Sequence, residues 1–80
     1  MKKTVEHRDL IDDFEFMFWC DRNYENSAVV KWRYAYIVYV RDGRTPRAAA
    51  LKMSVCEDTV YRRVRKYEAA AKKYKAEQSA

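Results

Sequence analysis

Glycine and proline are almost absent from this chain of 80 residues: Gly43 is its single glycine and Pro46 its single proline. Sheets depend on tight turns that usually need such residues, so their scarcity favours helices joined by short turns. The length suffices for one small domain with a modest core. We therefore expect a single all-α domain over residues 1–80, with three core helices or four helices in total.

Residues 7–21 are predicted to form the first helix. Apolar residues recur there at i, i+1, i+4, i+7 and i+8, which is the spacing of one helical stripe that faces a core. Phe16 and Trp19 fall on the far side, among acidic residues, and are expected to be exposed. The predicted stripe consists of Leu10, Ile11, Phe14, Met17 and Phe18, and we expect Phe14 and Phe18 in the core.

The second predicted helix, residues 28–41, is apolar around most of its circumference, which is typical of a helix at the centre of a domain or against a partner. Asn26 or Ser27 is the expected N-cap, and Asp42-Gly43 is a suitable helix end. A strand is the alternative, because Val, Ile and Tyr favour sheets. The apolar residues are Val29, Val30, Trp32, Tyr34, Tyr36, Ile37, Val38, Tyr39 and Val40, of which Trp32 and Tyr36 are expected in the core.

A third helix is predicted to begin at Pro46, with Thr45 as its N-cap, because proline suits the first helical position. It continues to residue 53, and its three consecutive alanines allow another helix to approach closely. The last helix is expected over residues 57–75, with a frayed tail at 76–80. Its apolar stripe consists of Val60, Val64, Tyr67, Ala71 and Tyr74.

Charge is divided unevenly along the chain. Residues 1–26 carry four bases and seven acids, a net charge of −3, whereas residues 27–80 carry thirteen bases and five acids, a net charge of +8. A basic half of this strength suits a polyanion, of which nucleic acid is the usual example. The alternative is that the lysines and arginines only keep a small domain soluble.

Several classes of site have no support in the sequence. His7, Cys20 and Cys56 lack the paired spacing of metal ligands, so no metal or other cofactor is expected. No base is arranged to serve a catalytic cysteine, and Cys56 beside two acids should be less prone to ionise, so no enzyme is expected. The charged first fifteen residues do not form a signal peptide, and the apolar run at residues 34–40 is too short for a membrane span. We expect a cytoplasmic protein.

The stretch PRAAALKMSVCEDTVYRRVRKY, residues 46–67, resembles the helix-turn-helix of bacterial and phage transcription regulators. In that family the second helix enters the DNA major groove. The layout, with a long apolar helix before the motif, is also similar to the sigma-factor region that reads the −35 element and to phage late-gene antiterminators. The resemblance implies a helix-turn-helix at residues 45–66, with residues 67–80 as an extension of its last helix and a tail. The matching positions are Ala50, Met53, Val55, Val60 and Val64.

Two residues depart from the family pattern. Ser54 stands where the turn often has glycine, so it must adopt a positive φ or form a different turn. Cys56 stands where serine is frequent. Ser54 and Glu57 also fit an S-x-x-E capping box, in which Ser54 caps the last helix.

The face of the last helix opposite Val60 and Val64 supplies candidates for DNA contact. Arginine can donate two hydrogen bonds to a guanine edge, whereas contacts to phosphate set affinity and not sequence. Glu57 and Asp58 suit the helix N-terminus, where the dipole favours acids. The predicted base-reading residues are Thr59, Tyr61, Arg62 and Arg65. The predicted phosphate contacts are Arg44, Arg47, Lys52, Arg63 and Lys66.

Surplus aromatic residues predict a protein interface at Phe16, Trp19 and Tyr39, because so small a domain has little interior for them. A second copy of the chain, RNA polymerase or another regulator is a candidate partner. The sequence therefore predicts a regulator that binds duplex DNA in a sequence-dependent way, and the resemblance implies a phage or bacterial setting. The alternative is a protein-interaction module in which the helix-turn-helix is architectural. Operator, sign of regulation and oligomeric state stay open.

Overall fold

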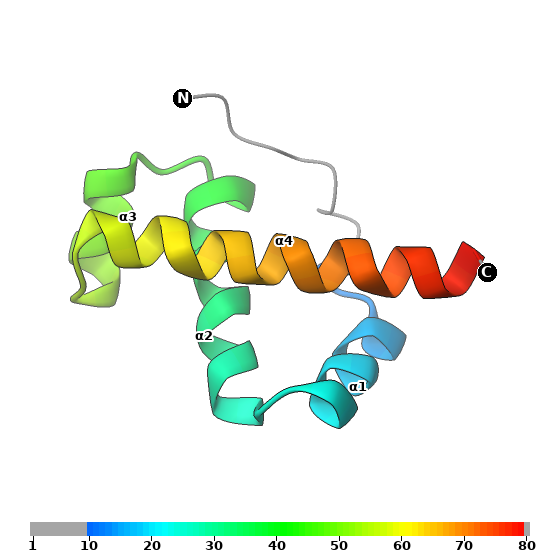
Figure 1. Cartoon of the computed structure of the whole chain (residues 1–80). Coiled ribbons are helices and arrows are strands. Elements are labelled where there is room, and N and C mark those ends of the chain that lie inside the picture. The colour runs from blue at the N-terminus through cyan, green and yellow to red at the C-terminus, as the bar shows by residue number, and fades with distance from the viewer. Residues whose placement is uncertain (1–9, 80) are drawn as a thin grey trace.

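The computed structural model describes residues 10–79, and within this range the chain is all-α, as predicted, with four α-helices and no strand. Figure 1 shows that α4 crosses the whole molecule, with α3 near its N-terminal end and α1 below its C-terminal half. No helix in residues 10–79 has the length and apolar character needed to cross a membrane. The elements are α1 (Phe14–Asn23), α2 (Asn26–Tyr36), the π-helical segment η2 (Ile37–Arg41), α3 (Pro46–Met53) and α4 (Glu57–Ser79).

Aromatic rings from α1, α2 and α4 form the centre of the core. Tyr36 of α2 stacks on Tyr67 of α4 with ring centroids 4.3 Å apart. Phe16 of α1 contacts the same Tyr67 edge-on at 5.6 Å and Tyr74 at 5.1 Å. The predicted stripe of α4, including Val60 and Val64, is buried throughout. The middle and C-terminal half of α4 therefore holds α1 and α2 together.

The predicted faces of the first helix are wrong. α1 begins at Phe14, since the Asp13 carboxylate accepts hydrogen bonds from the backbone N–H groups of Glu15 (2.9 Å) and Phe16 (3.2 Å). Leu10 and Ile11 are buried, but they precede the helix. Helical spacing counted from these two residues therefore does not predict which residues of α1 are buried. Phe14 and Phe18 are exposed at 68% and 59%, whereas Phe16 and Trp19 are buried at 2% and 6%.

The second helix forms as predicted, and the strand alternative is wrong. α2 begins at Asn26, so neither Asn26 nor Ser27 is the N-cap; Glu25 holds that position without a side-chain cap. Helical structure continues through η2 to Arg41. Tyr36 is buried, and Trp32 is partly buried against the core.

The start of the third helix is confirmed. Thr45 Oγ1 accepts a hydrogen bond from the backbone N–H of Ala48 at 3.1 Å, and Pro46 is the first helical residue. Ala49 and Ala50 are buried at 0% and 6%. Small side chains at these positions allow α3 to approach the rest of the core closely.

Ser54 ends α3 in the left-handed conformation, with φ 58° and ψ 42°. Its N–H donates to the carbonyl of Leu51 at 3.2 Å, and the N–H of Val55 donates to that of Ala50 at 3.0 Å. These two bonds form a Schellman motif with Ser54 at C′. The predicted capping box is therefore wrong, because Ser54 belongs to the end of α3 and not to the start of α4.

The last helix is longer than predicted. α4 runs from Glu57 to Ser79, so the expected fraying of residues 76–79 is wrong, and Ala80 lies outside the described residues. Trp19 Nε1 donates a hydrogen bond to Glu77 Oε1 at 3.1 Å, and Tyr74 is buried against α1. These contacts with α1 stabilise the C-terminal turns of α4.

Candidate nucleic-acid interface

The candidate interface is built on α3, the turn Ser54–Cys56 and the N-terminal half of α4. Val60, with no exposed area, and Val64 fix this half of α4 to the core. Val55 packs against the core from within the turn. The N-terminal half of α4 is therefore anchored to the core along one side, and its opposite side faces outward.

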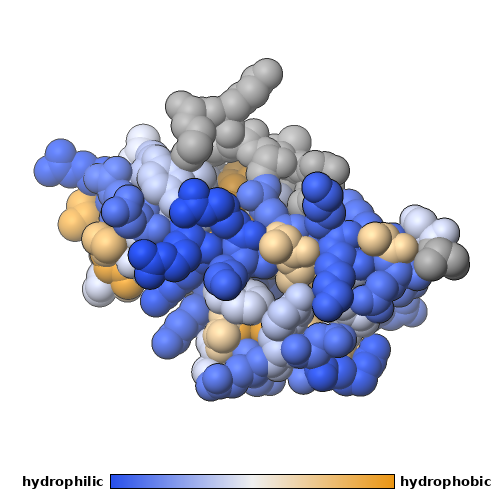
Figure 2. All heavy atoms as spheres, in the orientation of Figure 1, coloured by the Kyte–Doolittle hydropathy of each residue, from blue (hydrophilic) through white to orange (hydrophobic). Residues whose placement is uncertain are grey.

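Exposed basic residues follow the side of α4 opposite Val60 and Val64. We call them the outer ridge of α4: Arg62, Arg65, Lys66, Lys72 and Lys73. They extend over about 17 Å at 1.5 Å per helical residue. The one acid between Arg62 and Lys75, Glu68, is half-buried. Figure 2 shows a mostly hydrophilic surface where α4 crosses the molecule in Figure 1.

Lys72 and Lys73 were not among the predicted contacts. The helical spacing that places Arg62 and Arg65 opposite the buried side of α4 also places these two lysines there, so their exposure was predictable from the sequence. It was missed because the motif appeared to end at residue 66. The unbroken course of α4 to Ser79 joins both groups in one ridge.

Four of the five predicted phosphate contacts are exposed: Arg44, Arg47, Lys52 and Lys66. Arg47 and Lys52 belong to α3, and Arg44 lies just before it. Arg63 is half-buried at the flank of α4. Basic side chains from α3 and α4 thus flank one turn.

Thr59 and Tyr61 are half-buried and have structural contacts, unlike the exposed Arg62 and Arg65. The Tyr61 ring lies edge-on to Tyr39 with centroids 5.7 Å apart. Burial, with a further contribution from Tyr61, raises the pKa of Tyr39. Of the four predicted base-reading residues, the two arginines are the ones that the fold presents to solvent.

The two cysteines differ in environment. Cys56 is exposed, and its Sγ lies 3.1 Å from Thr59 Oγ1. This hydrogen bond lowers the pKa of Cys56, and it outweighs the raising effect of Asp58. Asp58 thus acts in the expected direction, but the net shift of the Cys56 pKa is opposite to the expected one because of the contact with Thr59. Burial, with a smaller contribution from Asp21, raises the pKa of Cys20 to about 11.

The predicted interface residues Phe16, Trp19 and Tyr39 are buried in the core, at 2%, 6% and 4% exposure. Their expected exposure is wrong, because Phe16 and Trp19 of α1 pack on Tyr74 of α4, and Tyr39 of η2 packs on Tyr61 of α4. Other large apolar side chains are exposed instead: Phe14, Phe18, Val30, Tyr34 and Leu51.

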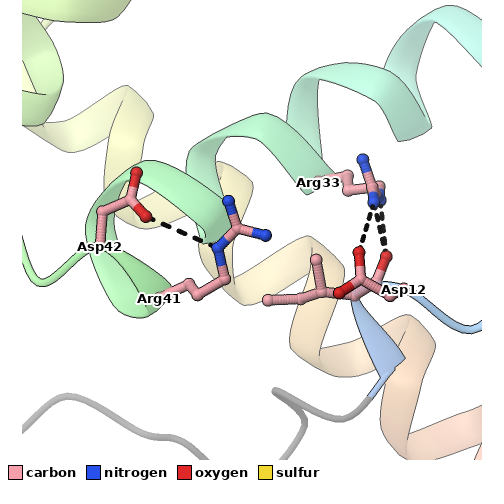
Figure 3. Close-up of polar contacts among 5 residues, drawn as sticks. Asp12, Arg33, Arg41 and Asp42 are labelled. Carbon is pink, nitrogen blue, oxygen red and sulfur yellow. Dashed lines mark hydrogen bonds and ion pairs between the residues drawn. The ribbon is translucent and has the colours of Figure 1, made fainter.

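Two further arginines are engaged in the fold, as Figure 3 shows. Arg33 donates through Nε and Nη2 to the carbonyl of Ile11, at 3.0 and 2.6 Å, and lies 3.7 Å from Asp12. Arg41 lies 3.5 Å from Asp42. These contacts tie the segment before α1 to α2 and the end of η2 to the following turn.

No group of three His, Cys, Asp or Glu side chains suited to a metal ion occurs in residues 10–79, and His7 lies outside that range. Comparisons with models of known protein families, with curated proteins and with solved structures give no match. The function is therefore argued from the site alone.

Proposed function

We propose that the protein binds duplex DNA in a sequence-dependent way through α3 and α4, used as a helix-turn-helix, and that it regulates transcription. The observation that carries the proposal is the outer ridge of α4, with exposed Arg62 and Arg65 on a helix whose other side is fixed in the core. A helix fixed in this way directs both arginines outward, and an arginine guanidinium can donate two hydrogen bonds to the edge of guanine.

The dimensions and charge of α4 suit the major groove. A helix with its side chains is about 10–12 Å wide, and the groove is about 12 Å wide. Between Arg41 and Lys66 the chain has eight basic and three acidic residues. Two of the acids, Glu57 and Asp58, lie in the first turn of α4, where the helix dipole stabilises them.

The contacts divide into two roles. Arg62 and Arg65 are assigned to base edges, with Thr59 and Tyr61 supporting the helix that carries them. The exposed bases around the turn, and the two lysines further along α4, are assigned to phosphates. The setting implied by the sequence resemblance is a bacterial or phage regulator.

Titration of the full chain against a selected duplex and a random duplex tests the proposal. We expect site-selective binding whose affinity falls steeply between about 50 and 200 mM salt. Arg62→Ala should relax discrimination at one base pair by about 1–3 kcal/mol. Arg47→Ala should weaken all duplexes alike and reduce the salt slope by about one.

Lys31→Ala is the matched control, because Lys31 is an exposed base on α2, outside α3 and α4. It should leave both affinities unchanged. Equal binding of selected and random duplexes would overturn sequence-dependent reading. The absence of any salt-dependent binding would favour the other candidate, a protein-interaction module, which the exposed apolar residues of α1 and α2 support.

A further inference from the structure

A groove of about 340 Å³ opens between α1 and α2. Val30 and Tyr34, at its edge, are 59% and 42% exposed. Apolar surface of this kind, gathered on one face, is typical of an interaction site. The groove is lined by Met17 and Asp21 of α1, by Val30, Arg33 and Tyr34 of α2 and by Ile37 of η2, among others.

A pair of exposed aromatic side chains lies beside this groove. Phe14 and Phe18 are four residues apart, so they share one side of α1, next to Met17 and Asp21. The opposite side of α1 packs on α4 through Phe16. The exposed aromatic pair therefore borders the groove on the α1 side, and Phe18 also lines a second hollow with Tyr74 and Gln78 of α4.

The two sides of this face have opposite charge. The segment from Asp12 to Arg22 contains four acids and one base. Asp12 already pairs with Arg33 and Asp13 caps α1, which leaves exposed Glu15 and Asp21 on α1 and exposed Lys31 on α2. When α1 of one molecule lies against α2 of another, acids therefore meet bases. A two-fold interface forms this contact twice, because each partner supplies the same surface.

We propose that this face pairs with the same face of a second copy of the chain. Phe18 of each protomer then enters the groove of its partner, and Glu15 of each lies near the partner's basic α2 helix. The helices involved have only ten and eleven residues. Because so short a face buries little area, we expect a dissociation constant on the order of micromolar.

Sedimentation equilibrium of the full chain without DNA, from about 1 to 500 µM, tests the pairing. We expect a concentration-dependent dimer. Phe18→Glu and Val30→Glu should each weaken it at least tenfold, because they bury a charge in the interface. Leu51→Glu is the matched control at an exposed leucine on α3 and should leave the dimer unchanged. Circular dichroism verifies that each variant stays folded.

Exchanging the charges of Glu15 and Lys31 distinguishes specific self-pairing from non-specific association. Glu15→Lys and Lys31→Glu should each weaken the dimer several-fold, and the double variant should recover it. A monomer at all concentrations, a dimer indifferent to Phe18→Glu, or the absence of recovery would overturn the proposal. DNA is absent from these measurements, so their outcome is independent of the proposed function.

Discussion

Ser54 is the residue on which the geometry of the turn depends. It is the one non-glycine residue with positive φ in residues 10–79. An L-residue in this conformation costs roughly 1–2 kcal/mol, which glycine avoids. Glycine in turn loses about 0.5–1 kcal/mol through the greater freedom of the unfolded chain. The helix-turn-helix family often has glycine at this position. In this chain serine adopts the same positive-φ conformation.

Ser54→Gly should therefore stabilise the protein by about 0.5–1 kcal/mol. Urea unfolding followed by far-UV circular dichroism measures the change. Ser27→Gly is the matched control, because Ser27 lies in the first turn of α2 with ordinary helical geometry, where glycine should destabilise by about 0.5–1 kcal/mol. A loss of stability in Ser54→Gly would mean that the side chain contributes more than the strain it carries.

At the scale of an element, α1 determines which aromatic residues are core and which are surface. Phe16→Ala removes a ring buried against Tyr67 and Tyr74 and should destabilise by about 3–5 kcal/mol. Phe14→Ala removes a ring that is 68% exposed and should change stability by less than about 0.5 kcal/mol. Equilibrium unfolding in urea compares the two. Equal effects, or a larger effect at Phe14, would contradict the placement of α1.

The helical content and the start of α3 were predictable because each depends on neighbours in sequence, as with Thr45 and Pro46. The face of α1 was not, because Asp13 starts the helix three residues after Leu10 and shifts the position from which the stripe must be counted. Periodicity alone does not indicate where a helix begins. The length of α4 was missed for a different reason: its last turns depend on Trp19, which is distant in sequence.

The same distinction, between features set by neighbours in sequence and features set by tertiary contacts, applies to the candidate site. Arg62 and Arg65 were predictable as exposed residues, since one helix period fixes them opposite Val60 and Val64. The contact of Tyr61 with Tyr39 was not, because it joins α4 to η2 through the tertiary fold. An exposed surface was expected at Phe16 and Trp19 because the faces of α1 were predicted in reverse, and at Tyr39 because its contact with Tyr61 depends on the tertiary fold.

At the scale of the whole molecule, the two proposed surfaces face different ways. Tyr36 of α2 and Phe16 of α1 both point toward Tyr67 of α4. Val30 and Tyr34 lie on the opposite side of α2 and Phe14 on the opposite side of α1, whereas Phe18 lies at the edge of α1 and lines a hollow with Tyr74 and Gln78 of α4. The outer ridge of α4 faces outward on its own side, so pairing through α1 and α2 leaves it uncovered. A two-fold axis through that interface then directs the two ridges away from each other.

A dimer of this form should bridge two duplexes instead of reading two adjacent half-sites on one. We expect wild-type protein, above its dimerisation concentration, to retain a fluorescent duplex on beads that carry a second, biotinylated duplex. Phe18→Glu should abolish the retention while leaving the affinity for a single duplex unchanged, because Phe18 belongs to α1 and not to the ridge. Ser79→Glu, an acid introduced at the exposed last residue of α4 and outside the ridge, should bridge like the wild type. If Phe18→Glu instead weakened binding to tandem half-sites, the two ridges would have to lie on one duplex, and the proposed arrangement of the dimer would be wrong.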